Sequence, residues 1–86
     1  MMPDMILKLI FKYLSKTKQV EFLKRRGIVL GTRNSDGRQA YLYMVNNLFA
    51  EIFYEKDNPR LSPERLVILH GLENLTRYLE KDLRKA

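Results

Sequence analysis

The residues of this chain that could do acid–base or metal chemistry are few and scattered. His70 is the only histidine, and the 86 residues contain no cysteine. A metal centre or a nucleophile–base pair needs several such side chains at fixed spacing, and His70 has no second histidine, cysteine or spaced acidic cluster beside it. Phosphate-binding glycine loops and the serine elbow of hydrolases are also missing. We therefore expect a non-enzymatic protein with no catalytic residue, metal or other cofactor.

Glu51 is the one acidic residue in an unusual place. It lies within an apolar segment that we expect to form a strand. The sequence pattern offers it no partner, and such an acid is more often an interface or edge residue than a general acid. We interpret Glu51 in that way.

Basic residues outnumber acidic ones by 16 to 10, which gives a formal net charge of +6. Such a charge favours an anionic partner, whether nucleic acid, a membrane surface or an acidic protein. Three consecutive cations, Lys24, Arg25 and Arg26, would also stabilise the C-terminal end of a helix. The alternative is a nucleic-acid-binding surface, whose candidate residues are Lys16, Lys18, Lys24, Arg25, Arg26, Arg33 and Arg38.

The segment from Gly27 to Glu55 would position Glu51 and two of these arginines, and its pattern predicts three antiparallel strands. Asn34-Ser35-Asp36-Gly37 predicts a type I turn closed by a left-handed glycine, and Asn46-Asn47 predicts a tight two-residue hairpin. The second hairpin would pair Val45 with Leu48, Tyr43 with Ala50 and Tyr41 with Ile52.

Strand alternation makes both faces of this sheet largely apolar, so each face needs a cover. A bulge at Gly37 would place Val29, Gly31 and Arg33 on the face of the tyrosines, and a one-residue shift would exchange the faces of the first strand. We interpret the tyrosines as core residues rather than as a platform for stacked bases. The tyrosine face is expected to hold Tyr41, Tyr43, Val45, Leu48, Ala50, Ile52 and Tyr54, and the other face Ile28, Leu30, Leu42, Met44, Phe49, Glu51 and Phe53.

Two helices are predicted before the sheet. Pro3 and Asp4 begin an amphipathic helix within residues 1–15, and Lys8 and Lys12 interrupt it too often for a signal sequence or a membrane span. Three roles are open to this helix: it covers a sheet face of its own chain, packs against a second copy, or lies on an anionic membrane. The first role is the commonest. A second helix over residues 17–26 would be capped by Ser15 or Thr17 and ended by Gly27.

Two further helices are predicted after the sheet. Ser62 and Pro63 resemble a helix start, which predicts a short helix over residues 63–69 that Gly71 ends. A last helix over residues 72–85 would carry an apolar stripe formed by Leu72, Leu75, Leu79 and Leu83.

These patterns predict one small α+β domain over residues 1–86, in which a three-stranded antiparallel meander is packed with helices in the order α-α-β-β-β-α. Residues 1–15 form the helix that could be an interface, and residues 16–86 the helix–meander–helix core. We expect a cytoplasmic protein-interaction or structural and regulatory module that forms a homodimer or binds another protein, without stable membrane insertion. Nucleic-acid binding is the alternative. The expected interface residues are Ile6, Leu9, Ile10, Tyr13, Met44, Phe49 and Phe53.

Overall fold

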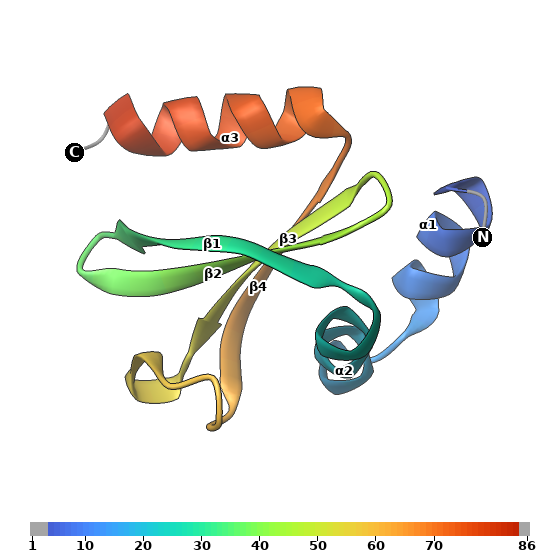
Figure 1. Cartoon of the computed structure of the whole chain (residues 1–86), viewed down its shortest axis with the longest axis horizontal. Coiled ribbons are helices and arrows are strands. Elements are labelled where there is room, and N and C mark those ends of the chain that lie inside the picture. The colour runs from blue at the N-terminus through green and yellow to red at the C-terminus, as the bar shows by residue number, and fades with distance from the viewer. Residues whose placement is uncertain (1–3, 85–86) are drawn as a thin grey trace.

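The fold is an antiparallel sheet with helices on both faces. The computed structural model describes the backbone of residues 4–84 and the side chains of residues 8–81. Figure 1 shows α3 on one side of the sheet, α2 on the other, and α1 beside α2, off the end of the sheet near the hairpin between β2 and β3. The predicted α+β class is confirmed. The elements are α1 (Asp4–Tyr13), α2 (Lys16–Arg26), β1 (Ile28–Ser35), β2 (Arg38–Val45), β3 (Leu48–Tyr54), the 3-10 turn η1 (Glu55–Asp57), β4 (Pro63–His70) and α3 (Leu72–Arg84).

The sheet has four strands in the order β1-β2-β3-β4, not the predicted three. The segment expected as a short helix from Pro63 is β4, which pairs antiparallel with β3. Proline is tolerated at the first position of an edge strand, so the Ser62-Pro63 signal does not require a helix. The run Leu66–Leu69 that follows is continuous and rich in branched residues, and it gives β3 a neighbour on its second side.

The first hairpin differs from its prediction by one residue. Ser35 pairs with Arg38 across a two-residue loop, in which Asp36 has φ 54° and Gly37 has φ 78°. Two successive positive φ angles are typical of a type I′ turn, whose twist matches that of the strands. Gly31 therefore pairs with Leu42 and Arg33 with Ala40, which places both on the face opposite the tyrosines. A bulge between Val29 and Gly31 pairs Val29 with Tyr43 and so keeps Val29 on the tyrosine face, the face predicted for it.

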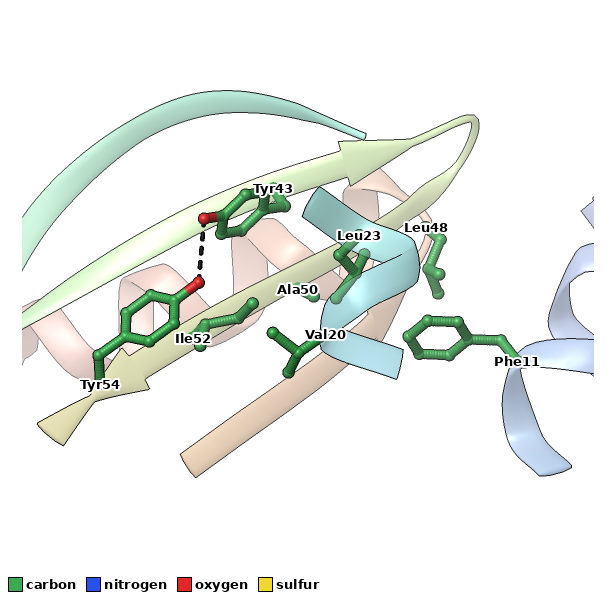
Figure 2. Packing of buried hydrophobic residues seen from close by; sticks show 8 residues of the cluster. All are labelled: Phe11, Val20, Leu23, Tyr43, Leu48, Ala50, Ile52 and Tyr54. Atoms are coloured by element: carbon green, nitrogen blue, oxygen red, sulfur yellow. Dashed lines mark hydrogen bonds between the residues drawn. The ribbon is translucent and has the colours of Figure 1, made fainter. Parts of the chain in front are cut away.

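The second hairpin and the tyrosine face are confirmed. Val45 pairs with Leu48, Tyr43 with Ala50, and Tyr41 with Ile52. The side chains of this face pack under α2, which contributes Val20 and Leu23, as Figure 2 shows. The buried cluster consists of Phe11, Val20, Leu23, Tyr43, Leu48, Ala50, Ile52 and Tyr54.

Helix α2 ends at the predicted residue and is capped by Ser15, one of the two predicted caps, but it begins at Lys16, one residue earlier than predicted. The Ser15 side chain accepts a hydrogen bond from the Lys18 N–H, and the Gly27 N–H donates to the Leu23 carbonyl at 2.9 Å. A Cβ at Gly27 would lie 2.6 Å from that carbonyl oxygen and 2.9 Å from Val45 Cγ2. Only glycine allows the chain to pass this closely from α2 into β1.

Helix α3 lies over the opposite face of the sheet, where β3 places Phe49, Glu51 and Phe53. Leu75 is its most deeply buried described residue, at 5% exposure. Both faces are expected to need covers, and α2 covers the β2–β4 part of one face and α3 part of the other. The apolar side chains of β1 that stay exposed are Ile28 at 57%, Val29 at 55% and Leu30 at 46%. None of the described helices is long and apolar enough to cross a bilayer.

Candidate binding surface

A buried polar cluster joins the sheet to α3. Glu51 is fully buried, and Arg33 binds it in a bidentate pair, with Nε to Oε2 and Nη2 to Oε1 both at 2.7 Å. Tyr78 of α3 hydrogen-bonds Glu51, and burial followed by that bond raises the pKa of Tyr78 to about 12. Interpreting Glu51 as an edge or interface residue was wrong, because β4 makes β3 an inner strand and the shifted first hairpin brings Arg33 within reach.

The chemistry available at this cluster is limited. A hollow of about 150 Å³ adjoins it between α3 and the first two strands. Its only acid, Glu51, is already held by a guanidinium and a phenol, so the arrangement is that of a structural ion pair. The hollow is lined by Leu30, Gly31, Thr32, Arg33, Leu42, Glu51 and Leu79.

His70 lies at the end of β4, opposite Leu48. Its pKa is lowered by partial burial and, secondarily, by the positive charge of Lys8. Among the residues that the structure describes, no three histidine, cysteine or acidic side chains gather as a metal site would require.

The seven residues of the predicted nucleic-acid surface do not form one patch. Arg33 is held by Glu51, and Arg38 binds Asp57 at 3.2 Å and Glu64 at 2.6 Å. The two ion pairs raise the pKa of Arg38, with Glu64 as the largest cause. The pKa of Asp57 is lowered chiefly by a hydrogen bond from the Gln39 N–H and then by Arg38. The other five, Lys16, Lys18, Lys24, Arg25 and Arg26, are exposed on α2.

Two of the α2 lysines also have local structural contacts. Lys16 Nζ donates to the Glu64 carbonyl at 2.6 Å, and Lys24 Nζ to the Pro59 carbonyl at 2.7 Å. Lys24 further lies over the Tyr54 ring, 4.8 Å from its centroid. These contacts hold the lysines against the sheet and its loop without neutralising their charge.

Of the three sheet tyrosines expected in the core, Tyr43 and Tyr54 are buried and Tyr41 is partly buried against them. Tyr54 is fully buried, Tyr43 is 6% exposed, and their hydroxyls lie 3.0 Å apart (Figure 2). Burial, followed by the bond to Tyr43, raises the pKa of Tyr54. These rings offer no open surface on which bases could stack.

The predicted interface residues divide into two groups. Phe49 and Phe53 are 6% and 5% exposed within the chain itself, so they are not free surface, and Met44 is half-buried. The side chain of Ile6 lies outside the described residues. The other three, on α1, are well exposed: Leu9 at 52%, Ile10 at 44% and Tyr13 at 80%.

Phe11 attaches α1 to the core of the domain. Its ring is 2% exposed, points into the core cluster, and meets Phe22 edge-on at 6.0 Å (Figure 2). Gln19 holds the Phe11 carbonyl with a 2.9 Å hydrogen bond. The sequence prediction missed Phe11 because it followed the wider stripe. The helical spacing of Phe11 and Leu14, both packed on the core, is the signal that could have found it.

The outward side of α1 is apolar as well. At about 100° per residue, Leu9, Ile10 and Tyr13 share one sector of the helix and Phe11 lies across from it. Lys12 borders this sector, with its Nζ 5.9 Å from the Tyr13 ring centroid. We call Leu9, Ile10 and Tyr13 the α1 stripe.

No protein-family model, curated protein or solved structure matches this chain.

Proposed function

We propose that the protein is a non-enzymatic binding module and that α1 is its binding element. The observation that carries this proposal is the orientation of α1, which Phe11 anchors to the core while the α1 stripe faces outward. A helix that served only as a cover would turn its wider apolar side inward. The lack of cysteine fits a reducing cytoplasm, where we place the module.

The stripe contributes little to the fold of its own chain. Val20 and Leu23 of α2 cover the tyrosine face, and Phe11 is the only fully buried described side chain of α1. Three large apolar side chains left exposed on one short helix are available to a partner.

Replacing the stripe tests this proposal. We expect the triple variant Leu9→Ser, Ile10→Ser, Tyr13→Ser to fold with an unfolding free energy lowered by only about 1–2 kcal/mol, because Leu9 and Ile10 are half-exposed, Tyr13 is mostly exposed, and serine is a weaker helix former. It should also lose binding of a dye that reports exposed apolar surface. Leu72→Ser is the matched control, because Leu72 is 63% exposed on α3. A triple variant that fails to fold would show that the stripe is part of the core and would refute the proposal.

Nucleic-acid binding is a second candidate, which the charge of α2 supports. Its eleven residues hold five cations and one acid. Phosphate contacts would make the affinity fall steeply with salt concentration, and Lys18→Gln with Arg25→Gln would reduce that dependence. Binding of a duplex that does not change between 50 and 200 mM salt would exclude this candidate.

A further inference from the structure

We infer that the partner of α1 is the surface of an anionic lipid bilayer, on which the helix lies with the α1 stripe in the interfacial region. This inference rests on the proposed function, since it takes α1 as the binding element and names what α1 binds. Three observations favour a bilayer over other partners: the distribution of charge, the small area of the stripe, and the kind of side chains that form it.

Charge is concentrated in the two N-terminal helices. Residues 1–26 contain seven lysines and arginines and two acidic residues, so they hold five of the six formal net charges. Lys8 and Lys12 are both exposed on α1 itself, and Lys12 borders the stripe. An apolar sector beside lysines is the pattern of helices that lie on anionic membranes, where each nearby cation adds to the attraction.

A second copy of this chain fits the stripe less well. From their exposed fractions, the three described side chains offer roughly 400 Å² per copy, so a pair held by these side chains alone would bury about 800 Å², below the ~1,200 Å² at which specific interfaces begin. Pairing two stripes would also bring together two regions of the same positive charge, which costs free energy.

A bilayer requires neither a large area nor a matching groove. Its interface accepts a leucine, an isoleucine and an aromatic ring with a polar tip wherever they project, and tyrosine is enriched at that depth. Tyr13, the most exposed residue of the stripe at 80%, is such a ring. Nucleic acid would use the cations but would leave the apolar side chains in water.

Binding would not require the domain to unfold. Phe11 and Gln19 hold α1 to the core from the side opposite the stripe. The helix can therefore meet a flat surface while α2 continues to cover the sheet.

The test is co-sedimentation of the full chain with vesicles at 50 mM salt. We expect binding to vesicles with 30% phosphatidylglycerol to be at least roughly tenfold stronger than to pure phosphatidylcholine. It should weaken at 500 mM salt, be lost in the stripe triple variant, and persist in Leu72→Ser. Lys8→Gln with Lys12→Gln should weaken it without changing the unfolding temperature.

Four results would overturn the inference. If the protein ignores anionic vesicles and forms a dimer that the stripe variant abolishes, the bilayer is wrong but α1 remains the binding element. If the stripe variant sediments as well as the wild type, charge alone accounts for binding, and the proposed function fails as well. If a DNA duplex is bound in a way that the stripe variant does not alter, nucleic acid is the partner. Equal binding to neutral and anionic vesicles would also contradict the inference.

Discussion

Arg33 reaches across strand β2 to hold Glu51 in a bidentate ion pair that joins the edge strand to an inner strand. Both contacts measure 2.7 Å, and the carboxylate is fully buried. Ala40, the residue paired with Arg33 on β2, is small and leaves the guanidinium room to cross. Tyr78 adds a hydrogen bond from α3. One buried acid thereby links two strands and the covering helix.

Removing only one member of this pair should be costly. We expect Arg33→Met to lose about 3–5 kcal/mol of unfolding free energy, because Glu51 would stay buried without its cation. The double variant Arg33→Met, Glu51→Met should recover a large part of that loss, as measured by urea denaturation.

The exposed pair Arg77–Glu73 provides the control, since its side chains are 72% and 78% exposed. Arg77→Met should change stability by less than about 0.5 kcal/mol. If the double variant lost as much unfolding free energy as the single variants Arg33→Met and Glu51→Met lose when added together, the two residues would not be coupled.

Acid should weaken the contacts of η1 with β2. The pKa of Asp57 is lowered, first by the Gln39 N–H and then by Arg38, so the folded state favours its carboxylate. This stabilisation is complete above the unfolded value of about 3.9 and is lost as pH falls through the lower folded value. Wild type should therefore lose thermal stability more steeply below about pH 4 than Asp57→Asn. Parallel pH profiles for the two proteins would contradict this role of Asp57.

Two glycines should respond to alanine in opposite ways. Gly27→Ala would place a methyl group 2.6 Å from the Leu23 carbonyl oxygen, and we expect a loss of about 1–3 kcal/mol. Gly31→Ala meets no atom within 4 Å and should be neutral or stabilising by up to about 1 kcal/mol, because it restricts the unfolded chain. Chemical denaturation of both variants measures the difference, and equal losses would show that the passage from α2 to β1 is not tight.

Two aromatic residues of α1 should differ just as clearly. Phe11→Ala removes a core ring, and we expect it to lose about 3 kcal/mol and to release α1. Tyr13→Ala removes a ring that is 80% exposed and should leave stability within about 0.5 kcal/mol of the wild type. Hydrogen exchange of the α1 amides measures the release, which should occur in the first variant alone. Exchange that rises equally in both would mean that Phe11 is not the anchor.

Local signals predicted several parts of this fold correctly. The two-residue loop at Asn46-Asn47 fixed the register of β2 with β3, because strand alternation leaves no freedom once the turn is known. Ser15 and Gly27 mark the two ends of α2, because each caps the helix through contacts within a single turn.

The errors arose where a distant partner outweighs a local signal. β4 is a strand because it pairs with the side of β3 that β2 leaves open, and the local residues Ser62 and Pro63 carry no signal of that distant pairing. Arg33 meets Glu51 only because the Asp36-Gly37 loop takes the type I′ form, and a one-residue difference in that turn decides the face of the whole strand. The sequence pattern grouped Leu9, Ile10 and Tyr13 on one side of the first helix but could not show that Phe11 would turn them outward.

The outward orientation of the α1 stripe can be measured directly with a single tryptophan, because the chain has none of its own. In Tyr13→Trp, we predict emission and acrylamide quenching typical of a ring in water, and a blue shift with reduced quenching when vesicles with 30% phosphatidylglycerol are added. Phe11→Trp is the control for a ring in the core and should be shielded throughout. A shielded tryptophan in Tyr13→Trp, in a protein that light scattering shows to be monomeric without vesicles, would contradict the account.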